Sequence, residues 1–442
     1  MNHLDRLADL IAHARKAGAD AADAVLVAGT SLSVERRLGQ TEHVERSEGQ
    51  DVGLRVFIGQ HSAIVSATSI DPTGFAALAE RAVAMAKVVP EDPWIGLAET
   101  AGPPAPDTLD LEDPVEASVQ ELLSRAAIAE DAARAVKGVT NSEGASAGYG
   151  RTEVLLVTSA GFAGRRVGTS HSISATALAG SGTDMQRDYD YHGVIHLADL
   201  DDPAVIGHNA GERAVRRLNP IRPQTGKVPI VFDPRVAGGL VGHLTGAING
   251  SGIARGTSFL KDKMGMRIFP AGVFIHDDPR RVRGARSKMF DGEGTPTQAR
   301  ALIEDGVLTT WLLDSRSARQ LGLASTGHAA RGTSGPPSPS ATNVYMAAGV
   351  IGPDALIADI KFGLYITEMI GMGVNGITGD YSRGAAGFVI RDGALAEPAA
   401  EITVAGNLLE MFAHLTPAND LTFRRGTDAP TIRIEGMTLA GA

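Results

Sequence analysis

The stretch GMGVNGITGDYSRGAAGFVIRDG, residues 371–393, interleaves seven glycines with the polar residues Asp380, Tyr381, Ser382 and Arg383. Glycine permits positive φ angles and lets a main chain approach a ligand closely. Binding residues are often carried by loops of this kind, because a folded scaffold holds them in place. The stretch therefore predicts a shaped recognition surface on a strand-rich part of the fold.

The surrounding C-terminal half reads as short strands and glycine turns. VPIVFDP, residues 228–234, predicts a strand that feeds a helix starting near Asp233, and a last helix is expected at about 407–414. NPIRPQTGKVP, residues 219–229, holds three prolines and a glycine between periodic elements. Such a segment is typical of a domain boundary, which predicts domains at 1–220 and 221–442.

The N-terminal half combines strands with flanking helices. Leucines at helical spacing predict a first helix, and further helices are expected at 73–88, at 114–136 and from about 201 to 218. Strands are expected at 24–70, as a small antiparallel meander, and at 151–200, and a proline-rich spacer spans 91–110. Because the strands cluster and do not alternate strictly with helices, the predicted class is α+β.

Composition excludes several classes of protein. The 442 residues are 43% hydrophobic and 21% charged, as in soluble globular proteins. A formal charge of −10 disfavours a broad nucleic-acid-binding face, and no apolar run is long enough for a membrane span. The charged N-terminus is unlike a signal peptide, and the chain has no cysteine. Both features favour a cytoplasmic protein without disulfides.

Two histidines four residues apart, His192 and His196, match the spacing of zinc ligands on a helix. The residues between them favour a strand, however, which would separate the two rings by about 13 Å at a rise of about 3.3 Å per residue. No glutamate lies between them to activate a water molecule. We therefore interpret them as polar residues of a half-exposed strand.

Other patterns have simple structural interpretations. Asp-Gly-Glu-Gly, with Asp291 and Glu293, contains the residues that tight turns prefer, although a carboxylate cluster with Asp277 and Asp278 is an alternative. Ser258 and Lys261 match the S-x-x-K spacing of some hydrolases, but the motifs that accompany it are absent. His243 stands alone on a glycine-rich helix, where a hydrogen-bonded structural histidine is the commoner case.

Several segments together resemble the TldD/PmbA family. They are SEGQDVGLRVFIG (47–59), GKVPIVFDPRVAGGLVGHL (226–244), RGTSFL (255–260), FDGEGTPTQARALIEDGVLTTWLLDSRSARQLG (290–322), TGDYSRGAAGFVIRDG (378–393) and EITVAGNLLEM (401–411). They cover nearly the whole chain in the family's order. The resemblance implies a cytoplasmic heterodimer of two kinds of subunit that cleaves unfolded peptides and takes part in peptide maturation.

The resemblance also implies where the family's chemistry is located. The TldD kind carries an H-E-x-x-x-H helix that holds zinc together with a later cysteine. In this sequence the corresponding interval, residues 235–254, contains His243 but no glutamate and no second histidine, and the cysteine is missing. Without about three protein ligands zinc has no stable site. The chain therefore resembles the PmbA or TldE kind, with no metal or catalytic residue of its own and with zinc in a TldD-type partner.

The resemblance suggests residues for the peptide channel or the partner contact: His243, Arg255, Asp380, Tyr381, Ser382, Arg383 and Gly384. Backbone groups of the glycine-rich loops would bind an extended peptide. Asp380 and Arg383 are either polar anchors in that wall or an ion pair that braces the loop. Two other functions stay open: an independent hydrolase with an unrecognised site, and a peptide-binding or regulatory protein. A homodimer is the alternative assembly for the chain alone.

Overall fold

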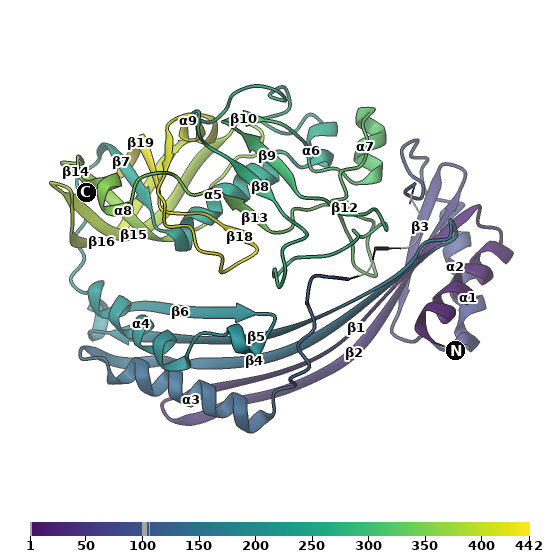
Figure 1. The fold of residues 1–442 in the computed structure, drawn as a ribbon, viewed down its shortest axis with the longest axis horizontal. Helices are drawn as coiled ribbons and strands as arrows, with labels where there is room; N and C mark the ends of the chain where they lie inside the picture. The colour runs from purple at the N-terminus through teal and green to yellow at the C-terminus, as the bar shows by residue number, and fades with distance from the viewer. Residues whose placement is uncertain (1, 100–103, 106) are drawn as a thin grey trace.

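A long, curved antiparallel sheet dominates the first half of the chain and extends beneath the C-terminal half (Figure 1). The computed structural model describes residues 2–99, 104–105 and 107–442. Part of the predicted proline-rich spacer, residues 100–103 and 106, lies outside the described residues. Helices and several sheets share the chain, which confirms the predicted α+β class.

The first sheet has six antiparallel strands in the order β3-β2-β1-β4-β5-β6. Their bounds are β1 Ala21–Arg37, β2 Gln40–Ile58, β3 His61–Ala67, β4 Val139–Thr158, β5 Ala163–Ala179 and β6 Gln186–Val194. β1 pairs with β4, so the two predicted strand regions form one continuous sheet. β4 also begins well before the predicted position, through a segment rich in glycine, serine and alanine whose pairing with β1 and β5 overrides weak local propensity.

Two pairs of helices cover this sheet. α1 (His3–Lys16) and α2 (Phe75–Ala86) pack at one end, and α3 (Val119–Ala135) and α4 (Pro203–Arg216) pack toward the other end (Figure 1). Short 3₁₀ turns occur at Pro72–Gly74, Gly182–Asp184 and Leu197–Asp199. All four predicted helices are present. The third starts five residues later than predicted, because Ser118 caps it and accepts a hydrogen bond from the N–H of Glu121.

Close packing between α3 and α4 depends on Gly207. A Cβ atom added at this position would overlap the carbonyl oxygen of Ala129. We expect Gly207→Ala to lower the free energy of unfolding by about 1–3 kcal/mol, because the helices must separate. The matched control is Gly239→Ala in α5 (Pro234–Ala247), where an added Cβ meets no atom within 4 Å. Thermal unfolding should show a lower Tm for the first variant and an equal or higher Tm for the second.

The C-terminal half contains three more sheets. Their orders are β10-β9-β8-β13-β18, β11-β12 and β16-β15-β14-β7-β19-β17, and β16 also pairs with β19. The strands are β7 Gly226–Phe232, β8 Ile275–Asp277, β9 Arg300–Glu304, β10 Val307–Leu308, β11 Ala329–Ala330, β12 Ser338–Pro339, β13 Val344–Met346, β14 Phe362–Ile370, β15 Asp380–Arg391, β16 Ala394–Asn407, β17 Leu415–Pro417, β18 Thr427–Asp428 and β19 Ile432–Ala440.

Five helices accompany these strands: α5, α6 (Gly250–Ala254), α7 (Ser315–Leu321), α8 (Pro353–Ile357) and α9 (Leu408–Ala413). The predicted turns at 304–306 and 391–393 join β9 to β10 and β15 to β16. In the second turn Asp392 and Gly393 both have positive φ, as tight hairpins require. Only the first part of the stretch 371–393 is a loop, because residues 380–391 form the regular strand β15.

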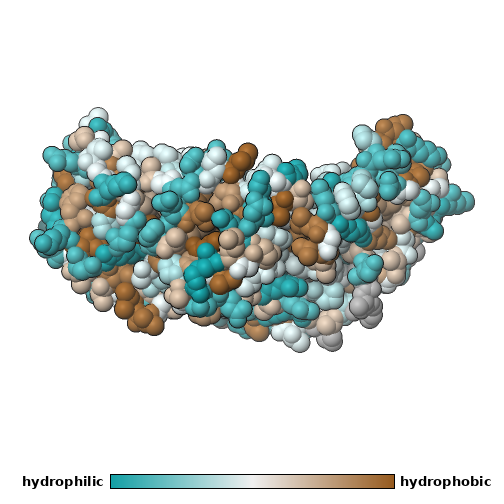
Figure 2. All heavy atoms as spheres, turned by 90° about the horizontal axis from the view of Figure 1, so that it is seen from above, coloured by the Kyte–Doolittle hydropathy of each residue, from teal (hydrophilic) through white to brown (hydrophobic). Residues whose placement is uncertain are grey.

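The surface agrees with the ordinary composition. The face seen from above mixes hydrophilic and hydrophobic residues, with apolar side chains scattered among polar ones (Figure 2). Each helix formed by the described residues is too short or too polar to cross a lipid bilayer.

Candidate functional site

Helix α5 begins where the sequence predicts it, directly after strand β7. The side chain of Asp233 caps it by accepting a hydrogen bond from the N–H of Arg235 at 2.8 Å, and Pro234 occupies the first turn. The apolar face of the helix is buried in the C-terminal core through Ala237, Leu240, Val241, Leu244 and Ala247. This packing fixes which face of α5 remains open.

The open face of α5 lines a cavity of about 360 Å³. Gly242, His243 and Gly246 lie on this face because residues three and four apart are neighbours on a helix. The opposite wall comes from the segment after α6, through Phe259, and from the loop 371–379 together with β15 and α9. The cavity thus joins the glycine-rich helix to the glycine-rich loop.

His243 lies against an aromatic wall. Its ring meets the ring of Tyr381 edge-on, with centroids 5.8 Å apart, and its Nε2 atom is buried without a hydrogen-bond partner among the described residues. Burial, and then the positive charge of Arg383, lower the pKa of the His243 imidazole below its usual range. Burial likewise raises the pKa of the Tyr381 hydroxyl to about 12. Both side chains are therefore neutral near pH 7.

His243 should make the protein sensitive to acid. Because its folded-state pKa is lowered, the unfolded chain binds a proton more readily below pH 6.5, and folding stability falls as the pH decreases through that range. We expect His243→Phe to lose less stability than the wild type between about pH 7 and 5. Urea unfolding at several pH values measures this, and parallel curves for both proteins would contradict it.

The loop 371–379 is fastened to β15. Arg383 donates from Nε to the carbonyl oxygen of Gly371 at 2.9 Å, and the N–H of Ser382 donates to that of Gly373 at 2.7 Å. The loop nevertheless presents large apolar side chains to solvent, with Met372 93% and Ile377 62% exposed. The rim of the cavity is therefore both held in place and apolar.

The ion pair considered for Asp380 and Arg383 does not form. Successive residues of a strand point to opposite faces, so residues three apart face away from each other. Asp380 instead accepts hydrogen bonds from Thr378 Oγ1 at 2.7 Å and from Asn407 Nδ2 at 3.3 Å. Arg383 alone of the two lines the cavity.

The other candidates lie in different places. Tyr381 is only 3% exposed, and its ring packs edge-on against the ring of His243. Ser382 is exposed, and Gly384 packs against Ile370, whose Cβ lies 3.3 Å from a Cβ built on Gly384. Arg255 follows α6 and lines a separate cavity of about 690 Å³. Of the predicted residues, the structure therefore brings together His243, Tyr381 and Arg383.

Family models match nearly all of this architecture. The model of the PmbA/TldA metallopeptidase domain 1 matches residues 22–86, the central domain matches 112–218 and the C-terminal domain matches 225–441. The chain belongs to the PmbA/TldD family. The resemblance seen in the sequence is thereby confirmed.

Individual relatives agree with this assignment. Metalloprotease PmbA of Escherichia coli O157:H7 is 37% identical over 426 residues, 96% of this chain and 92% of that protein. A Bacteroides thetaiotaomicron structure described as a candidate modulator of DNA gyrase has a TM-score of 0.90 at 26% identity, covering 99% of this chain and 98% of that one. TldE from Thermococcus kodakarensis has the same fold, with a TM-score of 0.89 at 22% identity and coverage of 99% and 100%.

The metal that the name metallopeptidase implies does not fit the α5 cavity. Zinc in proteins is held by about three or four thiolate, imidazole or carboxylate ligands. The cavity offers the single imidazole of His243, which faces Tyr381, and the cation Arg383, with no carboxylate in its lining. Among residues 2–99, 104–105 and 107–442, no three His, Asp or Glu side chains are placed to share a metal ion.

The histidine pair is separated by the end of its strand. His192 belongs to β6, which ends at Val194, and its Nδ1 accepts a hydrogen bond from the N–H of Asp201 at 3.1 Å. His196 lies beyond the strand, contrary to the prediction, and its Nε2 lies 3.1 Å from Asp110 Oδ1. Each ring therefore has its own structural partner.

The acidic cluster and the serine are also structural. Asp291 accepts hydrogen bonds from the backbone N–H groups of Glu293, Thr295 and Ala329, which confirms the turn interpretation. Ser258 donates from Oγ to the carbonyl oxygen of Ala247 at 2.6 Å. The hydroxyl thus braces the segment after α6.

The sequence interpretation missed the apolar lining of the site. Phe259, Met372, Val374 and Leu408 contribute to the cavity wall, whereas the predicted set was chosen for polar chemistry. The sequence could have pointed to two of these residues, because Phe259 and Leu408 fall within the segments RGTSFL and EITVAGNLLEM, which resemble the family. Met372 and Val374 lie in the quoted glycine-rich stretch itself.

Proposed function

We propose that this chain is a metal-free subunit of the PmbA/TldE kind, which acts in a cytoplasmic heterodimer with a TldD-type zinc subunit. The observation that carries the proposal is the α5 cavity, where the helix presents Gly242, His243 and Gly246 in place of a zinc ligand set. A chain that cannot hold zinc cannot lower the pKa of a bound water to about 7, which is the family's way of generating a nucleophile.

In this proposal the chain supplies part of a channel wall for unfolded peptides during peptide maturation. The fastened loop 371–379 carries exposed apolar side chains, and Met372 in particular adapts well to varied sequences. Backbone N–H and C=O groups of a glycine-rich rim bind extended chains with little dependence on side-chain sequence. Arg383, held by the carbonyl of Gly371, adds a positive charge to the cavity.

A two-domain division at residue 220 completes the proposal. All strands of the first sheet lie within residues 21–194, and all strands of the other sheets lie within 226–440. Pro220 and Pro223 lie between the two sets, whereas Pro229 belongs to β7. The first domain would then hold the curved sheet, and the second would hold the α5 cavity.

Co-expression tests this assignment directly. The chain and a TldD-type partner are produced separately and together, and zinc content and cleavage of an unfolded peptide are measured. We expect negligible zinc and no cleavage for the chain alone, a heterodimer with one zinc ion, and cleavage that a chelator abolishes. A homodimer of the chain that stays inactive is compatible with the proposal.

Two results would replace the proposal with an alternative. Peptide cleavage by the purified chain alone, unaffected by chelator, would establish an independent hydrolase. Peptide binding by the chain without any effect on the partner's proteolysis would establish a binding or regulatory protein. Arg383→Gln, compared with Arg391→Gln as a control on the same strand outside the cavity, then tests whether the α5 cavity carries the peptide.

A further inference from the structure

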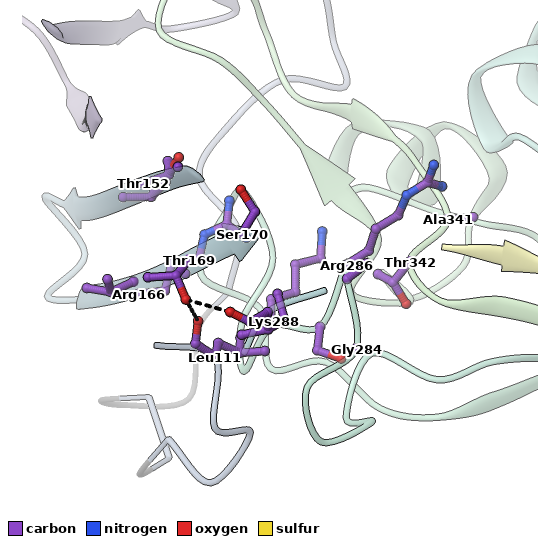
Figure 3. A pocket seen from close by; sticks show the side chains of 17 residues that line it. Leu111, Thr152, Arg166, Thr169, Ser170, Gly284, Arg286, Lys288, Ala341 and Thr342 are labelled. Atoms are coloured by element: carbon purple, nitrogen blue, oxygen red, sulfur yellow. Dashed lines mark hydrogen bonds between the residues drawn. The ribbon is translucent and has the colours of Figure 1, made fainter. Parts of the chain in front are cut away.

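A third cavity, of about 400 Å³, lies between the curved sheet and a loop of the C-terminal half (Figure 3). Its sheet side comes from β4 and β5, through Thr152, Arg166 and Ser170, and its loop side comes from Arg286 and Lys288. It shares no lining residue with the α5 cavity. Its volume lies within the range of about 300–1,000 Å³ typical of small-molecule sites.

Lys288 is a buried cation in this cavity. Its side chain belongs to a residue that is only 9% exposed, and among the described residues its ammonium group has no hydrogen-bond acceptor and no carboxylate within ion-pair distance. Burial, followed by the nearby charge of Arg166, lowers the pKa of Lys288 to about 8. The ammonium group reaches the open cavity, and no carboxylate of the described chain pairs with it, so the cavity presents an unneutralised positive charge.

Arg166 is a second cation in the same cavity. Burial lowers the pKa of its guanidinium group, and no hydrogen bond or ion pair holds that group within the part of the chain that the structure describes. The preceding residue, Arg165, points to the other face of β5 and pairs with Glu153. Strand β5 thus directs a partnered arginine outward and an unpartnered one toward Lys288.

The nearest carboxylates do not neutralise these cations. Asp291 and Asp277 influence Lys288 through space, but their oxygens are already engaged. Three backbone N–H groups donate to Asp291, and the side chains of His328 and Thr342 bind Asp277. Both cations therefore face the cavity without a direct carboxylate partner, and solvent or a bound anion can reach them there.

We propose that this cavity binds an oxyanion, a carboxylate or phosphate group, between Lys288 and Arg166. Oxygens of such a group would accept charge-assisted hydrogen bonds from both cations and would neutralise their charge. The hydroxyls of the exposed Thr152 and Ser170 line the approach and are available as neutral donors. Arg286, which is also exposed, adds positive charge at the loop side (Figure 3).

Isothermal titration of the full chain, in a buffer without oxyanions, tests the proposal. The ligands are inorganic phosphate, succinate, and a short peptide with a free or an amidated C-terminus. We expect saturable binding of at least one anion and about tenfold or weaker affinity in Lys288→Met and in Arg166→Met. The matched control Arg165→Met should bind like the wild type. Preference for phosphate identifies a phosphorylated ligand, and preference for the free over the amidated peptide identifies a peptide terminus.

Stability measurements separate a binding role from a structural one. If Lys288 binds an anion, the anion that binds in the titration should raise the Tm of the wild type and leave the Tm of Lys288→Met unchanged. Absence of saturable binding by all these anions at millimolar concentration would overturn the proposal, whatever the Tm of the variants. Equal weakening by Arg165→Met would also overturn it, because the effect would then be one of general charge.

Discussion

Asp23→Ala is expected to lower the free energy of unfolding by about 3–5 kcal/mol, because it leaves the buried Arg331 without its partner and leaves Arg55 only Glu293, whose Oε1 lies 3.8 Å from Arg55 Nη2. Asp23, on β1, accepts a hydrogen bond from Arg55 Nε on β2 at 2.9 Å and another from Arg331 at 2.6 Å. All three side chains are at most 7% exposed. Burial alone would raise the pKa of the Asp23 carboxyl, but Arg55 and Arg331 more than reverse this and lower it.

The same substitution should loosen the contact between the two halves of the chain. Arg331 begins the segment 331–343, which is irregular apart from the short strand β12, and its Nε and second terminal nitrogen have no other partner among the described residues. The loop crosses β2 so closely that a Cβ added at Gly53 would overlap the carbonyl of Thr333. Without Asp23 we expect faster proteolytic cleavage within 331–343.

Calorimetry and limited proteolysis measure both effects. Asp51→Ala is the matched control, since Asp51 is an exposed carboxylate on the same sheet with no hydrogen bond among the described residues. It should change stability by less than about 0.5 kcal/mol. A loss below about 1 kcal/mol for Asp23→Ala would mean that the cluster behaves like an exposed ion pair, contrary to the expectation.

Local signals explain what the sequence predicted well. The start of α5 is encoded by Asp233 and Pro234 directly after an apolar strand, so neighbouring residues decide it. The hairpin turn at Asp392 and Gly393 is local in the same way. The interval 235–254 is local as well: it contains His243 but no glutamate and no second histidine, and the metal-free role that this suggests stays a prediction.

Contacts between distant segments explain what the sequence could not predict. β1 pairs with β4 across more than 100 residues, and the sequence of neither strand indicates which strand it pairs with. Arg166 and Lys288 come from different halves of the chain, and neither belongs to a motif. Of the two interpretations of Asp380 and Arg383, the ion pair does not form, for a related reason. The two residues are close in sequence, but strand alternation directs their side chains to opposite faces of β15.

Lys288 should make stability rise with pH above 8. Burial lowers its pKa to about 8 in the folded protein, from the ordinary lysine value of 10.5. Between these values the unfolded chain holds the proton and the folded chain releases it, so unfolding takes up a proton and becomes less favourable as the pH increases. Below pH 8 the folded protein bears the full cost of burying the charged Lys288. As the pH rises to 10.5 this cost disappears, so the free energy of unfolding increases by about 3 kcal/mol.

The difference between wild type and Lys288→Met isolates this contribution, because other lysines and tyrosines titrate in both proteins. Without added oxyanion, the variant should be more stable at pH 7, and the two curves should converge by about pH 10. Equilibrium unfolding in urea across this range gives the comparison. Arg286→Met serves as the control, since this exposed cation of the same cavity should not change the slope. A constant difference between wild type and Lys288→Met at every pH would show that Lys288 keeps its ordinary pKa, and that a partner already holds its charge.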